Sequence, residues 1–111
     1  MAQSHYVFIE SRDPFDSTDT AFVADTAAEL RQRGRPVTVF LVQNGVLATR
    51  AGARGSHVAR LAGAGVRVLA DEFSLAERGI ETDELAASTR PCSIDALVDL
   101  LVQPDTKAVW H

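Results

Sequence analysis

The chain has 111 residues, a formal net charge of −4, 46% hydrophobic residues and 23% charged residues. This length provides for one domain (residues 1–111) with a single core, and the balance of residue types is that of a globular protein. The net negative charge argues against a nucleic-acid binder. No apolar run approaches the roughly 20 residues of a membrane helix. The one cysteine excludes an internal disulfide and any metal site built on paired cysteines.

The first part of the chain alternates strand and helix signals. His5–Glu10 is rich in β-branched and aromatic residues, which predicts a strand. From Thr18 to Arg33 the apolar residues recur at spacings of three and four, which predicts a helix that ends at Gly34. Pro36–Val42 is nearly all apolar, as a strand covered on both faces must be. The helical residues expected to face the core are Phe22, Val23, Thr26, Ala27 and Leu30.

The middle of the chain repeats this alternation with shorter elements. Val46–Arg50 is expected to form a helical turn, and Ser56 is expected to cap a helix that runs to about Ala62. Val66–Ala70 is a short apolar run typical of a buried strand. A short helix should follow it directly and end at Gly79.

The last third is less regular until its final helix. We interpret Glu84–Ala87 as a short fourth strand or a turn. Ser93 is expected to cap the last helix, and Pro104 to end it. Thr106–Trp110 predicts the final strand. The expected buried stripe of the last helix is Ile94, Leu97, Val98 and Leu101.

This order of elements predicts an α/β fold, a three-layer α/β/α sandwich with a five-stranded parallel sheet. Right-handed crossovers would place the carboxyl ends of all strands along one edge, where ligands bind in open α/β sheets. Polar residues follow these strand ends, so we expect a ligand site at this rim. Its expected residues are Glu10, Ser11, Gln43, Asn44, Asp71 and Glu72, with Cys92 and His111 near the same edge.

Two features of this rim have both a chemical and a structural interpretation. Asp71 and Glu72 can act as paired carboxylates in acid–base chemistry, or can stabilise the start of a helix through its dipole. Cys92 precedes a helix, where backbone N–H groups favour the thiolate, or it is a small residue that packs. The sequence leaves both pairs of alternatives open.

Other sequence motifs of catalysis and cofactor binding are absent. The chain has no HExxH motif, no G-x-S-x-G elbow, no phosphate loop and no dinucleotide fingerprint. We therefore expect neither a metal nor a cofactor. The N-terminus lacks the basic and then apolar build of a signal peptide, which predicts a cytoplasmic location.

The charges are unevenly placed along the chain. Val46–Ala70 holds four arginines and no acid, whereas Asp71–Asp105 holds nine acids and two bases. Such asymmetry can guide an anionic ligand, can dock two copies of one chain, or can be a solvated face.

Several landmarks occur in an order and at spacings typical of a known family. They are the strand, short helix and Arg-Gly-Ile of Val66–Ile80, Pro14–Phe15 in the first loop, Val37–Leu41 followed by Asn44–Val46, and the closing Asp105–Trp110. With these landmarks nearly the whole chain resembles the DsrE/DsrF-like family of sulfur relay and sulfur oxidation.

The resemblance implies a small α/β/α sandwich that assembles into oligomers. It also implies transfer of sulfane sulfur between partner proteins, as a persulfide on a cysteine at the end of the third strand. Asp71 occupies that position here. We therefore expect a non-catalytic or accessory subunit, in a homo-oligomeric dimer or trimer with Arg50–Arg60 near the interface. The alternatives are a persulfide carrier that uses Cys92 and a small-ligand sensor that uses the rim.

Overall fold

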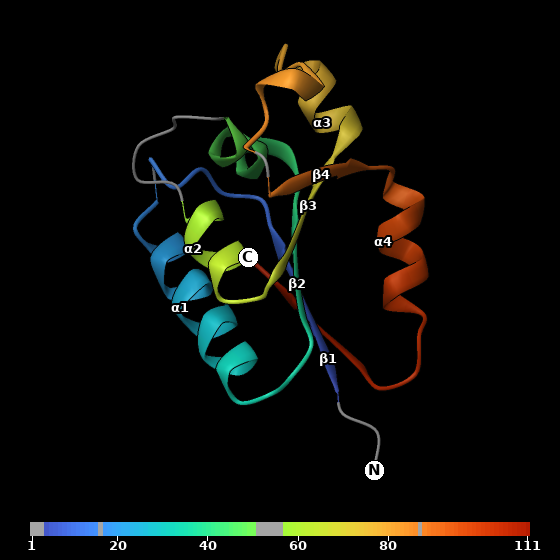
Figure 1. Cartoon of the computed structure of the whole chain (residues 1–111). Helices are drawn as coiled ribbons and strands as arrows, with labels where there is room; N and C mark the ends of the chain where they lie inside the picture. The colour runs from blue at the N-terminus through green and yellow to red at the C-terminus, as the bar shows by residue number, and fades with distance from the viewer. Residues whose placement is uncertain (1–3, 16, 51–56, 87) are drawn as a thin grey trace.

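Five parallel strands form one sheet in the order β4-β3-β2-β1-β5 (Figure 1). The computed structural model describes residues 4–15, 17–50, 57–86 and 88–111. All four neighbouring pairs of strands are parallel, which confirms the predicted α/β fold with a five-stranded parallel sheet. The strands are β1 (His5–Glu10), β2 (Val37–Leu41), β3 (Arg67–Asp71), β4 (Thr89–Cys92) and β5 (Thr106–Trp110).

Helices cover the two faces of this sheet unequally. Helices α1 (Asp19–Gln32) and α2 (Val58–Gly63) lie on one face, and α4 (Ile94–Leu101) lies on the other (Figure 1). The chain steps in one direction from β1 to β4 and then returns past β1 to β5, so a right-handed crossover places α4 on the opposite side. The short helix α3 (Glu72–Glu77) stands at the carboxyl edge of the sheet, because it follows β3 without a loop.

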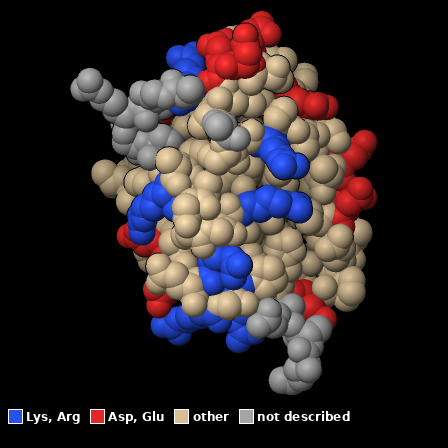
Figure 2. All heavy atoms as spheres, viewed as in Figure 1, with Lys and Arg blue, Asp and Glu red and all other residues tan. Residues whose placement is uncertain are grey.

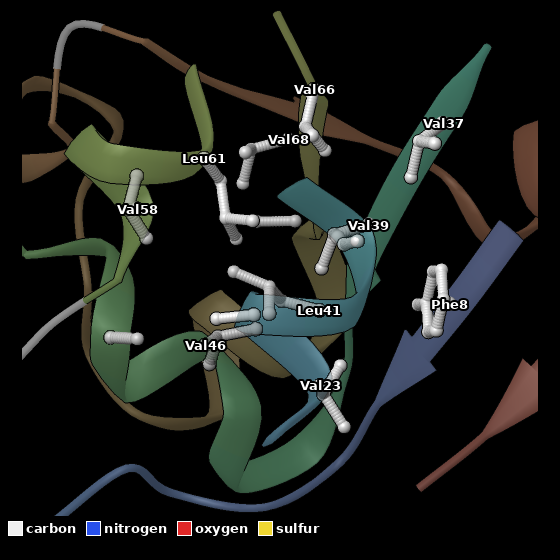
Figure 3. Close-up of a cluster of buried hydrophobic side chains, with 14 of the residues drawn as sticks. Phe8, Val23, Val37, Val39, Leu41, Val46, Val58, Leu61, Val66 and Val68 are labelled. Carbon is white, nitrogen blue, oxygen red and sulfur yellow. The ribbon is translucent and has the colours of Figure 1, made fainter. Parts of the chain in front are cut away.

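Two apolar cores result from this arrangement. Alternation along β1 sends Phe8 toward α1 and α2, and Val7 and Ile9 toward α4. The larger core, drawn in Figure 3, joins Phe8 to Val39 of β2 and to Leu61 of α2. The smaller core consists of Val7, Ile9, Phe40, Val42, Leu69, Leu97 and Leu100.

The fourth strand lies later in the chain than predicted. Residues 84–86, within the predicted Glu84–Ala87, contain the end of the 3₁₀ helix η2 (Thr82–Glu84) and a single bridge from Leu85, while Ala87 lies outside the described residues. The strand is formed instead by Thr89–Cys92. The sequence did not indicate this strand because of Pro91: proline lacks an N–H donor and argues against a strand. It is tolerated here because β4 lies at the edge of the sheet.

The predicted buried stripe of the last helix is wrong in three of its four members. Leu97 is buried as predicted, but its partner is Leu100, while Ile94 and Val98 are 50% and 51% exposed. Leu101 is exposed as well. Apolar residues surround this eight-residue helix on most sides, so their spacing does not identify the face that meets the sheet.

In the first helix, one residue that was expected in the core is exposed instead. Phe22 is 72% exposed, although its spacing predicted a core position. Val23 packs against the sheet together with small residues, because these let the helix axis approach closely; they are Ala24, Ala27 and Ala28. In the second helix, the predicted cap Ser56 lies outside the described residues, and α2 begins at Val58.

The helical turn expected over Val46–Arg50 is part of a longer 3₁₀ helix, η1 (Gln43–Thr49). This segment turns the chain at the end of β2 and brings Gly45 against the backbone of Glu10. A Cβ atom at position 45 would overlap with the carbonyl oxygen of Glu10, which accepts a hydrogen bond from Val42 N at 3.0 Å. Only glycine therefore fits here without a shift of the backbone.

Among the described residues, no helix has the length and apolar character needed to cross a bilayer.

Substitution Gly45→Ala should lower the free energy of unfolding by about 1–3 kcal/mol, because the added methyl group pushes β1 and η1 apart. Gly63→Ala is the matched control: position 63 ends α2, and a Cβ there meets open space. It should leave stability unchanged or raise it by about 0.5–1 kcal/mol. Urea unfolding of both variants provides the measurement, and equal stability of Gly45→Ala and the parent would contradict the close approach.

Candidate functional site

A pocket of about 530 Å³ opens at the carboxyl edge of the sheet, on the side of α4. Its floor is apolar and includes Val42 and Leu97. Its walls come from the junction of β3 and α3, from the start of α4 and from the end of β5. Three of the predicted rim residues line it together: Gln43, Asp71 and Glu72.

Asp71 is the N-cap of α3 and one of the polar residues that line the pocket. Its Oδ2 accepts hydrogen bonds from the backbone N–H of Ser74 at 3.0 Å and from the Ser74 hydroxyl at 2.7 Å. The residue is only 6% exposed. The structural interpretation of Asp71 as a helix cap is therefore confirmed.

Gln43 is tied into the same set of hydrogen bonds through its backbone. Its N–H donates to the hydroxyl oxygen of Ser74 at 2.9 Å. Gln43 adopts a φ of 51°, a left-handed conformation that costs energy for a residue with a side chain. The bond to Ser74 stabilises this turn, so one buried serine fixes the end of β2 against the start of α3.

Asn44 lies outside this pocket and has a structural partner. Its Oδ1 accepts from Nη2 and Nε of Arg78 at 3.0 and 3.2 Å, and Nη1 of Arg78 donates to the carbonyl oxygen of Ser74 at 3.2 Å. Asn44 and Arg78 thus hold η1 against the end of α3. The geometry gives Asn44 a role in positioning α3 and does not bring it to the pocket.

Glu10 and Ser11 form a second polar group, on the other side of the sheet. Glu10 is 5% exposed and its carboxylate oxygens lie 2.9 and 2.8 Å from Nδ1 of His111. Ser11 donates from its hydroxyl and from its N–H to the carbonyl oxygen of His111, both at 2.8 Å. Glu10 lines a separate cavity of about 30 Å³ against α1 and α2. The predicted rim is therefore divided into two groups by the sheet.

Cys92 ends β4 in direct register with Asp71 and packs against the smaller core. Partial burial raises the pKa of its thiol; the positive charge of Arg67 lowers it, and the carboxylates of Asp71 and Glu72 raise it further. The net direction is upward, so the thiol form prevails at neutral pH. Among the described residues, only Arg67 favours the thiolate, and its effect is smaller than that of burial.

The pocket also contains residues that the sequence analysis missed. Ser74 follows Asp71 by three residues, the spacing of an N-cap and the third helical position, and this signal could have identified it. Trp110 ends β5 at the same edge as the other strand ends. Phe73 and Glu77 had no signal of their own, because α3 is too short to show a period. No group of three or more histidine, cysteine or acidic side chains in the described parts of the chain can hold a metal ion.

The charge asymmetry of the sequence is visible on the surface. In Figure 2 the acidic side chains gather over α3 and the segment after it and along α4, whereas the basic ones lie across the middle and lower part of the same view. The pocket opens between α3 and α4 and therefore lies on the acidic side.

Comparison with solved structures places the fold among known ones. The chain is similar to the ychN protein from E. coli, with a TM-score of 0.86 and 18% identity over 99% of this chain and 100% of that one. It is also similar to MTH1491 from Methanobacterium thermoautotrophicum, a protein of unknown function, with a TM-score of 0.81, 18% identity and the same coverage. No family model matches the chain, and no curated protein matches it. At this identity the likeness establishes the fold alone.

Replacing Asp71 tests its role as a cap. Asp71→Ala leaves the N–H and hydroxyl of Ser74 without their acceptor, so unfolding free energy should fall by about 1–3 kcal/mol. Asp71→Asn retains an acceptor oxygen and should cost less. Asp99→Ala, at an exposed position of α4, is a control that should stay within about 0.5 kcal/mol of the parent. Urea unfolding measures all three, and a fully stable Asp71→Ala would exclude the capping role.

Proposed function

We propose that this chain is a non-catalytic, accessory member of the DsrE/DsrF-like family, and that it serves as an oligomeric subunit connected with intracellular sulfur transfer. The observed sheet with helices on both faces is the fold that the resemblance implies. The observation that carries the proposal is the state of Asp71. It stands at the end of β3, where the resemblance places a persulfide-forming cysteine, and its carboxylate is committed to capping α3.

A carboxylate at this position cannot take over the chemistry of a thiol. It is not a nucleophile toward sulfane sulfur, and it cannot hold a persulfide. The pocket beside Asp71 is nevertheless well formed and includes Gln43 and Glu72. We infer that this subunit keeps the shape of the family's site and uses it for binding. Gln43, Asp71 and Glu72 remain the proposed ligand-facing residues because they line this pocket. Glu10, Ser11 and Asn44 do not line it and have their contacts elsewhere in the chain.

A persulfide carrier that uses Cys92 is the second candidate function. The observation in its favour is the register of β3 and β4, which places Cys92 directly opposite Asp71. The observation against it is the raised pKa of the thiol, caused chiefly by burial. For both the accessory subunit and the carrier, we propose a cytoplasmic location and sulfur-transfer proteins as partners.

Exposed apolar side chains support a homo-oligomer. They gather on α4 and β5, where Val98 is 51% and Trp110 is 65% exposed. We propose that this surface contacts another copy, in a dimer or trimer. The predicted place of Arg50–Arg60 near the interface is not part of this proposal, because Arg60 of α2 pairs with Asp25 of α1 at 2.6 Å, on the face opposite α4. Residues 51–56 of that segment lie outside the described residues.

Light scattering at micromolar concentration should give the mass of two or three chains. Val98→Asp places a charge on the exposed side of α4 and should shift the mass toward one chain. Phe22→Asp changes an even more exposed apolar side chain of α1, on the opposite face of the sheet, and should leave the mass unaltered. A parent protein with the mass of one chain would refute the assembly.

A sulfur-loading experiment tests the functional proposal. The parent, Asp71→Cys and Asp71→Ser are treated with inorganic polysulfide and analysed by mass spectrometry. A cysteine thiolate attacks a sulfane sulfur of the polysulfide, so that one S–S bond forms, one breaks, and a polysulfide one sulfur shorter leaves. We expect persulfide at position 71 in Asp71→Cys and none in the parent or in Asp71→Ser, because the parent thiol is largely protonated at neutral pH.

The location of the sulfur distinguishes the candidates. Persulfide on Cys92 of the parent, abolished in Cys92→Ser, would replace the accessory role with the carrier role. Urea unfolding of Asp71→Cys checks that the variant is folded, because loss of the cap weakens the start of α3.

A further inference from the structure

We propose that the pocket between α3 and α4 binds an organic cation, an ammonium or guanidinium group attached to an apolar body. This deepens the ligand role proposed for Gln43, Asp71 and Glu72, and it does not depend on any sulfur chemistry. Three properties of the pocket lead to this class of ligand: its size, its charge and the two aromatic rings at its mouth.

The size and the floor of the pocket suit a small organic molecule. Its volume of about 530 Å³ falls within the range of roughly 300–1,000 Å³ that small-molecule sites occupy. Val42 and Leu97 supply a buried apolar floor, and Ile94 supplies a half-exposed wall. A ligand with an apolar body would remove this surface from water, which favours binding.

The charge of the pocket is negative. Asp71, Glu72 and Glu77 line it, and no lysine, arginine or histidine is found among the lining residues that the structure describes. Nη1 of Arg78 lies 3.9 Å from Glu77 but donates to the Ser74 carbonyl oxygen, and Nε and Nη2 donate to Asn44. Glu72 forms no ion pair with any described residue, so its charge is available to a ligand.

One carboxylate oxygen of Asp71 is left without a partner among the described residues. Both hydrogen bonds to its carboxylate end on Oδ2, and within the described part of the chain Oδ1 has no hydrogen-bond partner. The residue is 6% exposed and lines the pocket. An unpaired carboxylate oxygen in such a place favours a charged N–H donor, since charge-assisted hydrogen bonds are the strong ones. The backbone N–H groups of Ser74 and Gln43 are already used, which leaves few donors for an anion.

The aromatic rings support the same ligand class. Phe73 and Trp110 line the pocket and are 68% and 65% exposed. The face of an aromatic ring attracts a cation, most strongly for tryptophan, and repels an anion. Carboxylates and ring faces together select against persulfides and polysulfides, which are anions. The pocket therefore binds a different class of molecule from the one that the family's cysteine handles.

The fluorescence of Trp110 reports on this pocket directly, because the chain has a single tryptophan. We would titrate the parent with benzylamine, benzyl alcohol and benzoate, which are similar in shape and are cationic, neutral and anionic at neutral pH. Benzylamine should change the fluorescence saturably. Benzyl alcohol should bind at least about tenfold more weakly, since it lacks the charge-assisted bond, and benzoate should not bind. Calorimetry on the same solutions gives a second readout that does not depend on the tryptophan.

Two variants test the carboxylates. Glu72→Gln and Asp71→Asn should each weaken benzylamine binding several-fold and leave benzyl alcohol unchanged. Asp83→Asn is the control, because it removes an exposed acid of η2 that does not line the pocket, and it should bind like the parent. The Glu72 side chain is exposed and makes no hydrogen bond to a described residue, so its variant should fold even if Asp71→Asn does not.

An ammonium or guanidinium group can belong to a free amine or to a lysine or arginine side chain of another protein. N-acetyl-arginine amide, titrated in the same way, separates these sources: tighter binding than benzylamine indicates a side chain, and weaker binding indicates a free amine. Equal affinity for benzylamine and benzyl alcohol, saturable binding of benzoate, or no binding of either cation would overturn the inference. None of these results affects the sulfur-loading experiment, so the two proposals fail separately.

Discussion

The carboxylate of Asp71 stabilises the junction of β3 and α3, which forms one wall of the pocket. The end of β2, the end of β3 and the start of α3 meet there, and β3 passes into α3 without a loop. Ser74 donates to Asp71 and accepts from the N–H of Gln43, which links the three elements. Because β3 passes directly into α3, the cap determines where the helix starts. The position of α3 in turn forms one wall of the pocket.

The same constraint underlies the proposed non-catalytic role. A thiol at position 71 would be a poorer acceptor than a carboxylate for the two donors of Ser74. In the proposed DsrE/DsrF-like role, a residue that caps the helix and a sulfur-carrying cysteine would compete for one position. The carboxylate occupies it, and Cys92, directly across the strand pair, lies where burial opposes ionisation.

The sequence predicted those features that local patterns determine. Four strands had apolar or β-branched runs, and their alternation with helices gave the parallel sheet. The prediction failed where a pattern was ambiguous. Pro91 is unusual in a strand, so β4 was not recognised, and α4 has apolar residues on most sides, so their spacing did not identify the face that meets the sheet. The rim was predicted as one site because strand ends share an edge. Its division depends on register, since Glu10 faces α1 whereas Asp71 faces α4.

The unequal covering of the sheet connects the two proposals. In the described part of the chain, α1 and α2 cover one face of the sheet, whereas the eight-residue helix α4 covers the other. The thinner cover leaves the space beside the end of β3 open as the pocket. Ile94 and Trp110 belong both to the wall of that pocket and to the exposed apolar surface of α4 and β5. A copy that docks on this surface must therefore alter the pocket. By linkage, the proposed cation would then alter the docking of the proposed second copy by the same free energy, through these two side chains.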